Sequence, residues 1–373
     1  MKILFAGGGT GGHFYPLIAV ARSIYKIAEQ RKIAKVDIFL MADDPVDSDL
    51  IFKEHIKFIK ISAGKVRRYF SFLNIIDFIK TFFGIIFSFR KIYSLLPDVV
   101  FSKGGYSSFP VLFSARLLKI PVIVHESDSV PGIVNSWSGK WANRVIVSFS
   151  ESARFFDPQK VVVAGNPIRS GVVGGNLAEA WEHFDLEENI PTLLILGGSQ
   201  GSEKINETIL SIISQAVTKY QIVHQTGVKN FSDTSSRAKV ILELNALKHR
   251  YHAVPFLSEG DLKNASKAAS LVVARSGSTI FEIAAWGLPS ILIPLSNSAQ
   301  NHQRENAYNY AKTGACEVLE ENNLTPHILL AQIDKILGSQ EKVEKMKQGA
   351  ASFARPNAAD AIAQEIITLG IHD

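Results

Sequence analysis

At 373 residues the chain is too long for one ordinary hydrophobic core, and its 46% hydrophobic and 20% charged residues exclude a disordered protein. Its single cysteine, Cys316, excludes an internal disulfide framework and fits a reducing compartment. The net charge of +5 is uneven: residues 1–165 carry 22 lysines and arginines against 13 aspartates and glutamates, and such a basic half favours phosphates, nucleic acid or anionic lipid as partners.

Short apolar runs separated by helix-length segments recur along the chain. Their hydrophobicity is continuous and does not alternate, which is typical of strands buried on both faces of a parallel sheet covered by helices. Two such series predict two doubly wound α/β domains. The predicted strands lie in residues 2–6, 36–42, 98–104, 121–126, 144–149 and 161–165, and then in 192–201, 220–227, 252–256, 270–277, 289–295 and 315–320.

The first run, residues 2–6, is too short for the apolar core of a signal peptide, so we expect a cytoplasmic protein. The two series meet at AGNPIRS, residues 164–170, where glycine and proline mark a connection. We expect one domain over residues 1–165 together with a C-terminal helix over about 356–373, and a second domain over 166–355.

Both series open with a strand that enters a helix through glycines. The first reads ILFAGGGTGG (residues 3–12) and the second LLILGGSQGS (residues 193–202). Backbone N–H groups at such a helix start favour phosphate, and open α/β sheets bind ligands at the carboxyl ends of their strands. Two loops of this kind indicate two phosphorylated ligands or one long one.

The first loop also fits a second phosphate-binding motif. Gly7, Gly9 and Gly12 satisfy G-x-G-x-x-G, so a dinucleotide-binding fold stays open. The acidic residue that this motif needs for the ribose is not well placed, because Asp37 opens the next strand and Asp43 comes late. A P-loop is excluded, since a histidine stands where that motif has lysine.

That histidine, His13, is a candidate general base. A neutral imidazole facing a ligand site can accept a proton from a hydroxyl, because the ordinary pKa of histidine is about 6.5. The alternative interpretation is structural, with His13 capping the first turn of a helix.

The triplet DSD at residues 47–49 is similar to a metal-binding Asp-x-Asp. It stands in a polar stretch after MADDP, so we interpret it as a loop or helix cap. We expect no metal and no other cofactor.

Residues 70–92, FSFLNIIDFIKTFFGIIFSFRKI, predict a helix with a wide apolar face. Asp77 and Lys80 make it a poor membrane span, whereas the basic residues near its ends suit anionic headgroups. We therefore predict membrane contact, with a buried core helix as the alternative. The predicted contact residues are Phe72, Ile75, Ile79, Phe82, Phe83 and Ile86. A narrow polar strip contains Asn74, Asp77, Thr81, Gly84, Ser88 and Lys91.

In the second series, ARSGSTIFEIAAWGLPSILIP (residues 274–294) places Glu282 about one turn inside a helix that follows a strand. A carboxylate there can accept hydrogen bonds from both hydroxyls of a ribose. The alternative interpretation is a glutamate on a solvated face of the helix. His302 and Gln303 suit sugar hydroxyls, because an imidazole and an amide can both donate and accept. Arg169 can reach a diphosphate with its planar fork, or it is a surface arginine.

Seven motifs follow one another in a specific order and spacing: GGGTGGHFYP, KGGYSSFP, HESDSVPG, AGNPIRS, GGSQG, RSGSTIFEIAAWGLPSILIP and NHQRENA. By these motifs the chain resembles, over nearly its whole length, the MurG family of peptidoglycan N-acetylglucosaminyltransferases. These are GT-B glycosyltransferases. The resemblance implies two Rossmann-like parallel-sheet domains facing each other across a cleft.

The resemblance also implies inverting transfer of GlcNAc from UDP-GlcNAc to the C4 hydroxyl of the muramoyl sugar in undecaprenyl-diphosphate-linked lipid I, giving lipid II. The second domain would bind the donor and the first the lipid diphosphate. The implied donor residues are Thr10, Gly11, Gly12, Arg169, Ser199, Gln200, Phe256, Leu257, Arg275, Ser276, Gly277, Glu282, His302 and Gln303. The implied acceptor-diphosphate residues are Gly8, Gly9, Thr10, Gly11, Gly12 and Tyr106.

His13 matches the candidate base of the family. One stretch departs from the family pattern, which commonly reads H-E-Q-N where this chain has HESD at residues 125–128. Asp128 therefore replaces an amide near the expected acceptor site, and it joins Glu126 as a further candidate for the base.

Two other functions stay open at this point: another GT-B UDP-sugar transferase or epimerase, and a membrane-bound protein that binds nucleotide sugars without turning them over. The expected partners are UDP-GlcNAc, lipid I, an anionic membrane surface and other cell-wall synthesis and division proteins, with no nucleic acid. The expected location is the cytoplasmic face of the bacterial plasma membrane, as a peripheral protein.

Overall fold

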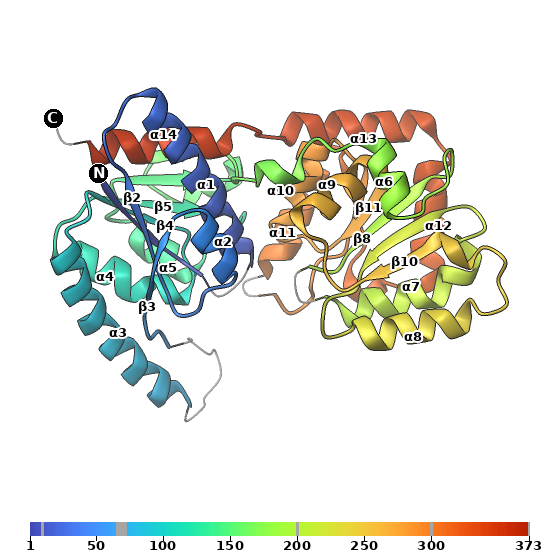
Figure 1. The fold of residues 1–373 in the computed structure, drawn as a ribbon, viewed down its shortest axis with the longest axis horizontal. Helices are drawn as coiled ribbons and strands as arrows, with labels where there is room; N and C mark the ends of the chain where they lie inside the picture. The colour runs from blue at the N-terminus through green and yellow to red at the C-terminus, as the bar shows by residue number, and fades with distance from the viewer. Residues whose placement is uncertain (9–10, 65–72, 199–200, 299–300, 372–373) are drawn as a thin grey trace. The chain divides into compact units, whose positions relative to one another are not determined.

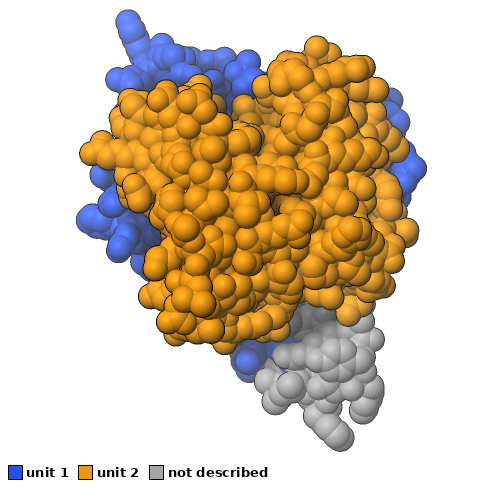
Figure 2. All heavy atoms as spheres, turned by 90° about the vertical axis from the view of Figure 1, so that its right-hand side faces the viewer, with its two compact units in different colours: residues 1–169, 355–373 blue, residues 170–354 orange. Residues whose placement is uncertain are grey.

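The computed structural model describes residues 1–8, 11–64, 73–198, 201–298 and 301–371, with the backbone alone at 73–76. The chain forms two compact units, one of residues 1–169 with 355–373 and the other of residues 170–354 (Figure 2). Each unit holds a parallel β-sheet with helices packed against it (Figure 1), so the predicted class of two doubly wound α/β domains is confirmed. The binding roles that the sequence assigns to the two domains stay predictions.

The sheet of unit 1 has seven parallel strands in the order β3-β2-β1-β4-β5-β6-β7. The order reverses between β1 and β4, so the carboxyl ends of these two strands border the crevice where such sheets bind ligands. As its continuous apolar run predicts, β1 is buried on both faces: Ile3 and Phe5 belong to one hydrophobic cluster, and Leu4 and Ala6 to another. The strands are β1 (Lys2–Ala6), β2 (Asp37–Ala42), β3 (Lys57–Lys60), β4 (Val99–Ser102), β5 (Val122–Glu126), β6 (Arg144–Val147) and β7 (Val161–Val163).

Helix α14 (Ala358–Gly370) is the last helix described, and it belongs to unit 1. It lies along α1 (Gly11–Gln30) (Figure 1), where it buries Ile366 and where Lys26 pairs with Asp360 at 3.0 Å. The other α-helices of unit 1 are α2 (Ser48–Lys53), α3 (Leu73–Leu95), α4 (Phe109–Leu117) and α5 (Ile133–Ser138).

Over residues 78–88, helix α3 packs its small residues against the fold and exposes most of its large apolar side chains. Gly84 and Ser88, which the sequence places in a polar strip, are buried on the α4 side, and a Cβ on Gly84 would lie 2.0 Å from the carbonyl oxygen of Ser62. The alternative of a buried core helix holds for part of α3, because Ile92 is fully buried, and it is wrong for the exposed apolar side chains that follow. We call the following exposed set the outer face of α3: Phe78 (74% exposed), Ile79, Phe82 (54%), Phe83 (61%), Ile86 and Phe87 (40%).

Of the predicted contact residues, Ile79, Phe82, Phe83 and Ile86 belong to the outer face of α3. Phe72 lies outside the described residues, as does the side chain of Ile75. No helix in the described part of the chain is both long and apolar enough to cross a bilayer.

The sheet of unit 2 has six parallel strands in the order β10-β9-β8-β11-β12-β13. Its order reverses between β8 and β11, so the second glycine loop also lies at a switch point. The strands are β8 (Thr192–Leu196), β9 (Gln221–Gln225), β10 (Tyr251–Val254), β11 (Ala269–Ala274), β12 (Ser290–Leu292) and β13 (Cys316–Val318). The α-helices are α6 (Leu177–His183), α7 (Glu203–Ala216), α8 (Phe231–Ile241), α9 (Glu259–Ala268), α10 (Thr279–Trp286), α11 (His302–Ala311), α12 (Pro326–Leu337) and α13 (Gln340–Phe353).

The position of α14 generates a test. Ile366→Ala removes a fully buried side chain between α14 and the sheet of unit 1, so we expect unit 1 to lose roughly 2–5 kcal/mol of unfolding free energy. Hydrogen exchange measured by mass spectrometry should show faster exchange in residues 1–169 and little change in 170–354. Thr368→Ala, at an exposed position of the same helix, is the matched control. Equal loss of protection in both units would contradict the assignment of α14 to unit 1.

Candidate functional site

The loop after β1 runs close to its neighbours. Gly7 has a φ of +141°, and a Cβ on Gly8 would lie 2.9 Å from the Cβ of Ala42 at the end of β2. Glycine is therefore needed at both positions. Helix α1 then begins at Gly11, so its N-terminal N–H groups, including that of Gly12, lie at the β1–β4 switch point, where an anion is favoured.

His13 lies half-buried in the first turn of α1, against the loop that follows β4. A Cβ on Gly105 of that loop would be 3.7 Å from the Cε1 atom of His13 and 3.8 Å from its Nδ1 atom. The loops after β1 and β4 thus meet at this imidazole. Its role as a base stays a prediction.

Tyr106 follows two glycines with left-handed backbone, Gly104 (φ +79°) and Gly105 (φ +83°). Its hydroxyl donates a hydrogen bond to the carboxylate of Asp43, in the loop after β2. Burial and then this hydrogen bond raise the pKa of Tyr106 well above the ordinary value of 10.0, so the hydroxyl stays protonated at neutral pH. Tyr106 therefore joins the loops after β2 and β4.

Glu126, the last residue of β5, is buried and holds the next turn of chain. Its Oε1 accepts from the N–H of Asp128 at 2.9 Å, and its Oε2 accepts from the N–H of Gly132 at 2.9 Å and from Nδ2 of Asn135 at 3.0 Å. Burial, and then the nearby charge of Asp128, raise the pKa of Glu126 to about 7. By these contacts the carboxylate of Glu126 holds the loop after β5 in place. Asp128, in that loop, is half-buried.

A fully buried lysine, Lys103, lies behind this edge and is missing from the sequence-based predictions. Its Nζ is 2.6 Å from Nδ1 of His125 and 2.9 Å from Oδ1 of Asn166. Burial lowers the pKa of Lys103 to about 7 and that of His125 well below its usual value. The neutral imidazole therefore accepts from Lys103 at Nδ1, and its Nε2–H donates to the carbonyl of Gly165 at 3.0 Å.

In unit 2, the loop after β8 repeats the arrangement of the first glycine loop. Gly201 has a φ of +77°, and a Cβ there would lie 2.1 Å from the carbonyl oxygen of Thr226. Ser202 caps α7, since its Oγ accepts from the N–H of Ile205 at 3.4 Å. A second helix start therefore faces the β8–β11 switch point.

Arg275 follows β11 and holds the second glycine loop. Its Nη2 donates to Oγ of Ser202 at 2.7 Å, and its guanidinium pairs with Glu321. The next residue, Ser276, is buried and donates through Oγ to the carbonyl of Gln303 at 2.7 Å. The described contacts of Arg275 and Ser276 thus shape the site, while direct contact of either residue, or of Gly277 beside them, with the donor stays a prediction.

Three further donor candidates lie beside this edge. Glu282 is half-buried in the first turn of α10, and His302 and Gln303 begin α11, after β12. Oε1 of Gln303 accepts from the N–H of Leu295 at 3.0 Å. The structure therefore brings Glu282, His302 and Gln303 to the same side of the sheet as the second glycine loop.

Phe256 and Leu257 follow β10, and a glutamine that the sequence analysis missed ties them to the second glycine loop. Oε1 of Gln225, the last residue of β9, accepts from the N–H of Leu257 at 3.0 Å, and its Nε2 donates to the carbonyl of Gly198 at 3.2 Å. Leu257 is buried, whereas Phe256 is exposed. Gln225 therefore fixes the spacing between two predicted parts of the donor site.

Arg169 is the last residue of unit 1 before the chain enters unit 2, and it is buried. Its guanidinium lies over the ring of Tyr15 in α1, 4.1 Å from the centroid. The structure thus places Arg169 beside the start of α1, where Gly11 and Gly12 lie. Four predicted donor or acceptor residues lie outside the described residues: Gly9, Thr10, Ser199 and Gln200.

No group of three or more histidine, cysteine, aspartate or glutamate side chains is arranged to hold a metal ion within the described residues. The DSD triplet is a helix cap, as predicted, because Oδ1 of Asp47 accepts from the N–H of Leu50 at the start of α2 at 2.9 Å.

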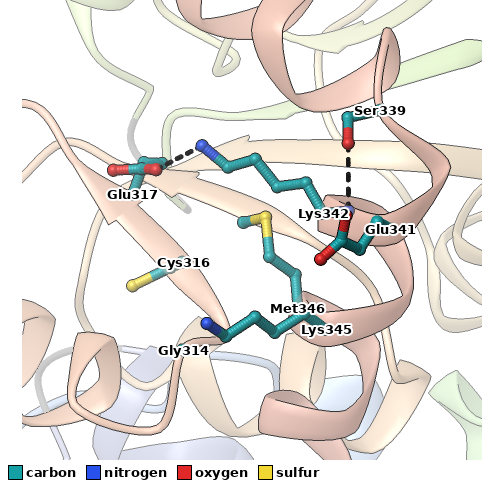
Figure 3. Close-up of a pocket in the computed structure, with 8 residues that line it drawn as sticks. All are labelled: Gly314, Cys316, Glu317, Ser339, Glu341, Lys342, Lys345 and Met346. Carbon is teal, nitrogen blue, oxygen red and sulfur yellow. Dashed lines mark hydrogen bonds and ion pairs between the residues drawn. The ribbon is translucent and has the colours of Figure 1, made fainter.

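A pocket of about 410 Å³ in unit 2 lies between β13 and the start of α13 (Figure 3). Gly314 and Cys316 line it at the amino end of β13, and Lys342 crosses it to pair with Glu317. Because the glycine loop of unit 2 lies at the carboxyl ends of the strands, this pocket is at the other edge of the sheet and takes no part in the predicted donor site.

The chain matches the glycosyltransferase family 28 N-terminal domain over residues 3–147 and the glycosyltransferase family 28 C-terminal domain over residues 192–362. It is 36% identical, over 97% of both chains, to the UDP-N-acetylglucosamine--N-acetylmuramyl-(pentapeptide) pyrophosphoryl-undecaprenol N-acetylglucosamine transferase of Thermodesulfovibrio yellowstonii. It is 34% identical to the enzyme of the same name from Halalkalibacterium halodurans, over 97% of this chain and 98% of the other.

Among solved structures, MurG of Acinetobacter baumannii superposes with a TM-score of 0.73 at 25% identity, over 98% of this chain and 99% of that one. UDP-GlcNAc 2-epimerase of Neisseria meningitidis reaches a TM-score of 0.69 at 15% identity, over 99% of this chain and 100% of that one, a likeness that shows the fold alone.

Two all-parallel α/β units, each with a glycine loop at its switch point, have the GT-B fold. The chain belongs to glycosyltransferase family 28, and within it to the MurG family.

Glu126 provides a test of the acceptor-side loop. Because its pKa is raised in the folded state, its contribution to stability is complete below the ordinary value of 4.5 and is lost as the pH rises to about 7. Glu126→Gln should therefore flatten this fall in unfolding free energy, measured by urea titration from pH 4.5 to 7.5. The variant should also be less stable at every pH in this range, by about 1–3 kcal/mol. The NH₂ group of the new amide cannot accept a hydrogen bond, so at least one of the three donors around Glu126 would lose its partner.

Glu29→Gln, at an exposed position of α1, is the matched control and should keep the slope of the wild type. A variant Glu126→Gln with the slope of the wild type would show that this carboxyl titrates normally.

Proposed function

We propose that this protein transfers GlcNAc from UDP-GlcNAc to the C4 hydroxyl of the muramoyl sugar of lipid I, with inversion, giving lipid II for peptidoglycan synthesis. The observation that carries this proposal is the 36% identity, over 97% of both chains, to an enzyme named for this transfer. The two glycine loops support it, because donor and acceptor each contain a diphosphate. No observation favours an epimerase or a binding protein without activity.

Unit 1 receives the acceptor in this proposal, with its diphosphate at Gly8 to Gly12 and beside Tyr106. Unit 2 receives the donor, with the ribose on Glu282 and the sugar near His302 and Gln303. The basic half of the chain thus meets the lipid phosphates, while the amide, imidazole and carboxylate groups of unit 2 meet hydroxyls.

In the proposed reaction, the imidazole of His13 takes the proton from the C4 hydroxyl. The oxygen forms a bond to the anomeric carbon as the bond from that carbon to the UDP oxygen breaks, and UDP leaves with the electron pair. Helix N-termini and Arg169 stabilise the departing diphosphate, so we propose that the chemistry needs no metal. Asp128 is the alternative base, since both oxygens of Glu126 already accept hydrogen bonds in the loop.

His13→Ala tests the base. We expect transfer from radiolabelled UDP-GlcNAc to a lipid I analogue, in the presence of EDTA, to fall by roughly 10²–10⁴-fold, which is the usual contribution of general base catalysis. Binding of UDP-GlcNAc, measured by calorimetry, should stay close to that of the wild type. Transfer that survives this change would move the base to Asp128, and Asp128→Asn would then be the damaging variant.

We propose that the protein works at the cytoplasmic face of the bacterial plasma membrane as a peripheral protein, because a polyprenyl-linked acceptor lies in the bilayer. The outer face of α3 supports this, since a contiguous exposed apolar surface of this kind marks an interaction site. An anionic membrane surface is the proposed partner, together with other cell-wall synthesis and division proteins.

Phe82→Ser tests membrane contact. Removing an exposed ring from the outer face of α3 should weaken binding to vesicles that contain phosphatidylglycerol by about tenfold in a flotation assay, since less apolar area is buried on binding. Leu244→Ser in unit 2, where the side chain is 99% exposed, is the matched control and should bind as the wild type does. Equal loss in both variants would assign the effect to general hydrophobicity.

A further inference from the structure

A pocket of about 490 Å³ lies in unit 1 between α3 and the segment that follows β3. Its volume is within the range of about 300–1,000 Å³ that is usual for small-molecule sites. Lys80, Phe83 and Phe87 line one wall, and their spacing places them on one face of α3. Lys60, the last residue of β3, belongs to the lining on the other side, with the chain that follows it.

The inner end of this pocket reaches the loops at the switch point. Asp43 lines the pocket and accepts the hydrogen bond from the hydroxyl of Tyr106. A Cβ on Gly8 would lie 3.9 Å from Oδ1 of the same Asp43. The pocket therefore begins beside the loops after β1 and β4, where the sequence predicts a diphosphate.

The outer end opens on the outer face of α3. Phe83 and Phe87 belong both to the pocket lining and to that exposed face. A ligand in the pocket can therefore extend from the surface proposed to meet the membrane to the loops proposed to hold phosphate.

The chemistry of the lining selects a ligand that is anionic at one end and apolar at the other. Lys60 and Lys80 supply two positive charges against the one carboxylate of Asp43, which already accepts a hydrogen bond from the hydroxyl of Tyr106. The two phenylalanine rings offer apolar contact within the same pocket. Inorganic diphosphate would leave the rings without a partner, and an alkane would leave the lysines without one.

We propose that this pocket holds the polyprenyl diphosphate segment of the acceptor, with the first isoprene units against Phe83 and Phe87 and the phosphates toward Lys60 and the loop after β1. This assignment rests on the proposed function, which requires an acceptor with this segment. A membrane phospholipid would satisfy the lysines, but nothing in its structure needs to continue to the switch-point loops. The polyprenyl diphosphate must reach them, because its sugar reacts there.

The test is binding of farnesyl diphosphate to the full chain, measured by calorimetry in buffer without vesicles or detergent. The wild type should bind it at least tenfold more tightly than it binds inorganic diphosphate or farnesol, because both ends of the pocket are then used. Phe87→Ser should weaken binding about tenfold and Lys60→Gln about fivefold. Tyr93→Ser, at a 65% exposed position of the same helix that is outside both the lining and the outer face of α3, is the matched control and should leave binding unchanged.

Three results would overturn the proposal. Equal binding in the wild type and Phe87→Ser would place the ligand elsewhere. Inorganic diphosphate bound as tightly as farnesyl diphosphate would reduce the pocket to an anion site. Dihexanoyl phosphatidylglycerol that displaces farnesyl diphosphate at equal concentration would make it a site for phospholipid headgroups.

A separate assay distinguishes failure of this proposal from failure of the proposed function. Transfer of GlcNAc by the wild type to an acceptor analogue with a short prenyl chain reports the reaction itself. Transfer without the expected variant effects on farnesyl diphosphate binding would overturn the pocket alone. The expected binding without any transfer would leave a prenyl diphosphate site and overturn the reaction.

Discussion

The fold of each unit depends on a glycine at which two stretches of backbone pass so close that no side chain fits between them. At Gly8 and Gly201 a Cβ would fall 2.9 Å from the Cβ of Ala42 and 2.1 Å from the carbonyl oxygen of Thr226. Because each glycine lies at a switch point, a buried strand can turn into a helix there without displacing the neighbouring loop. Helix N–H groups then face the ligand side. The chemistry proposed for this enzyme therefore depends on missing side chains as much as on His13 or Glu282.

The acceptor side combines this bare backbone with buried charge. Lys103 and Glu126 have pKa values shifted toward 7 from opposite directions, in both cases chiefly because burial disfavours the charged form. Glu126 contributes most stability at low pH, and Lys103 contributes most at high pH, so the two contributions are smallest together near neutrality. The edge that carries the site therefore gains least stability from these two groups near neutral pH, and such a local cost is common at functional sites.

Much of the fold follows from continuous apolar runs such as residues 2–6, which become strands buried on both faces. Strand β3 was not predicted, because it lies at the sheet edge and its exposed lysines at both ends interrupt the apolar run. Lys103 and Gln225 were not predicted, because their roles arise from partners far away in the sequence. The signal that could have identified Lys103 is its position directly after the buried run of β4. In α3 the apolar face was found, but Gly84 and Ser88 form the packing surface, since small residues allow close approach.

The return of α14 to unit 1 makes unit 2 an insertion within unit 1. A ribosome completes residues 170–354 before it has made the helix that covers α1, so the second unit can finish folding while the first waits for the last part of the chain. At about 5–20 residues per second, that delay lasts roughly ten seconds or more after the first unit's strands have emerged. The unit that carries the exposed aromatic helix is therefore the later of the two to mature, because residues 355–371 complete it only after unit 2 has been made.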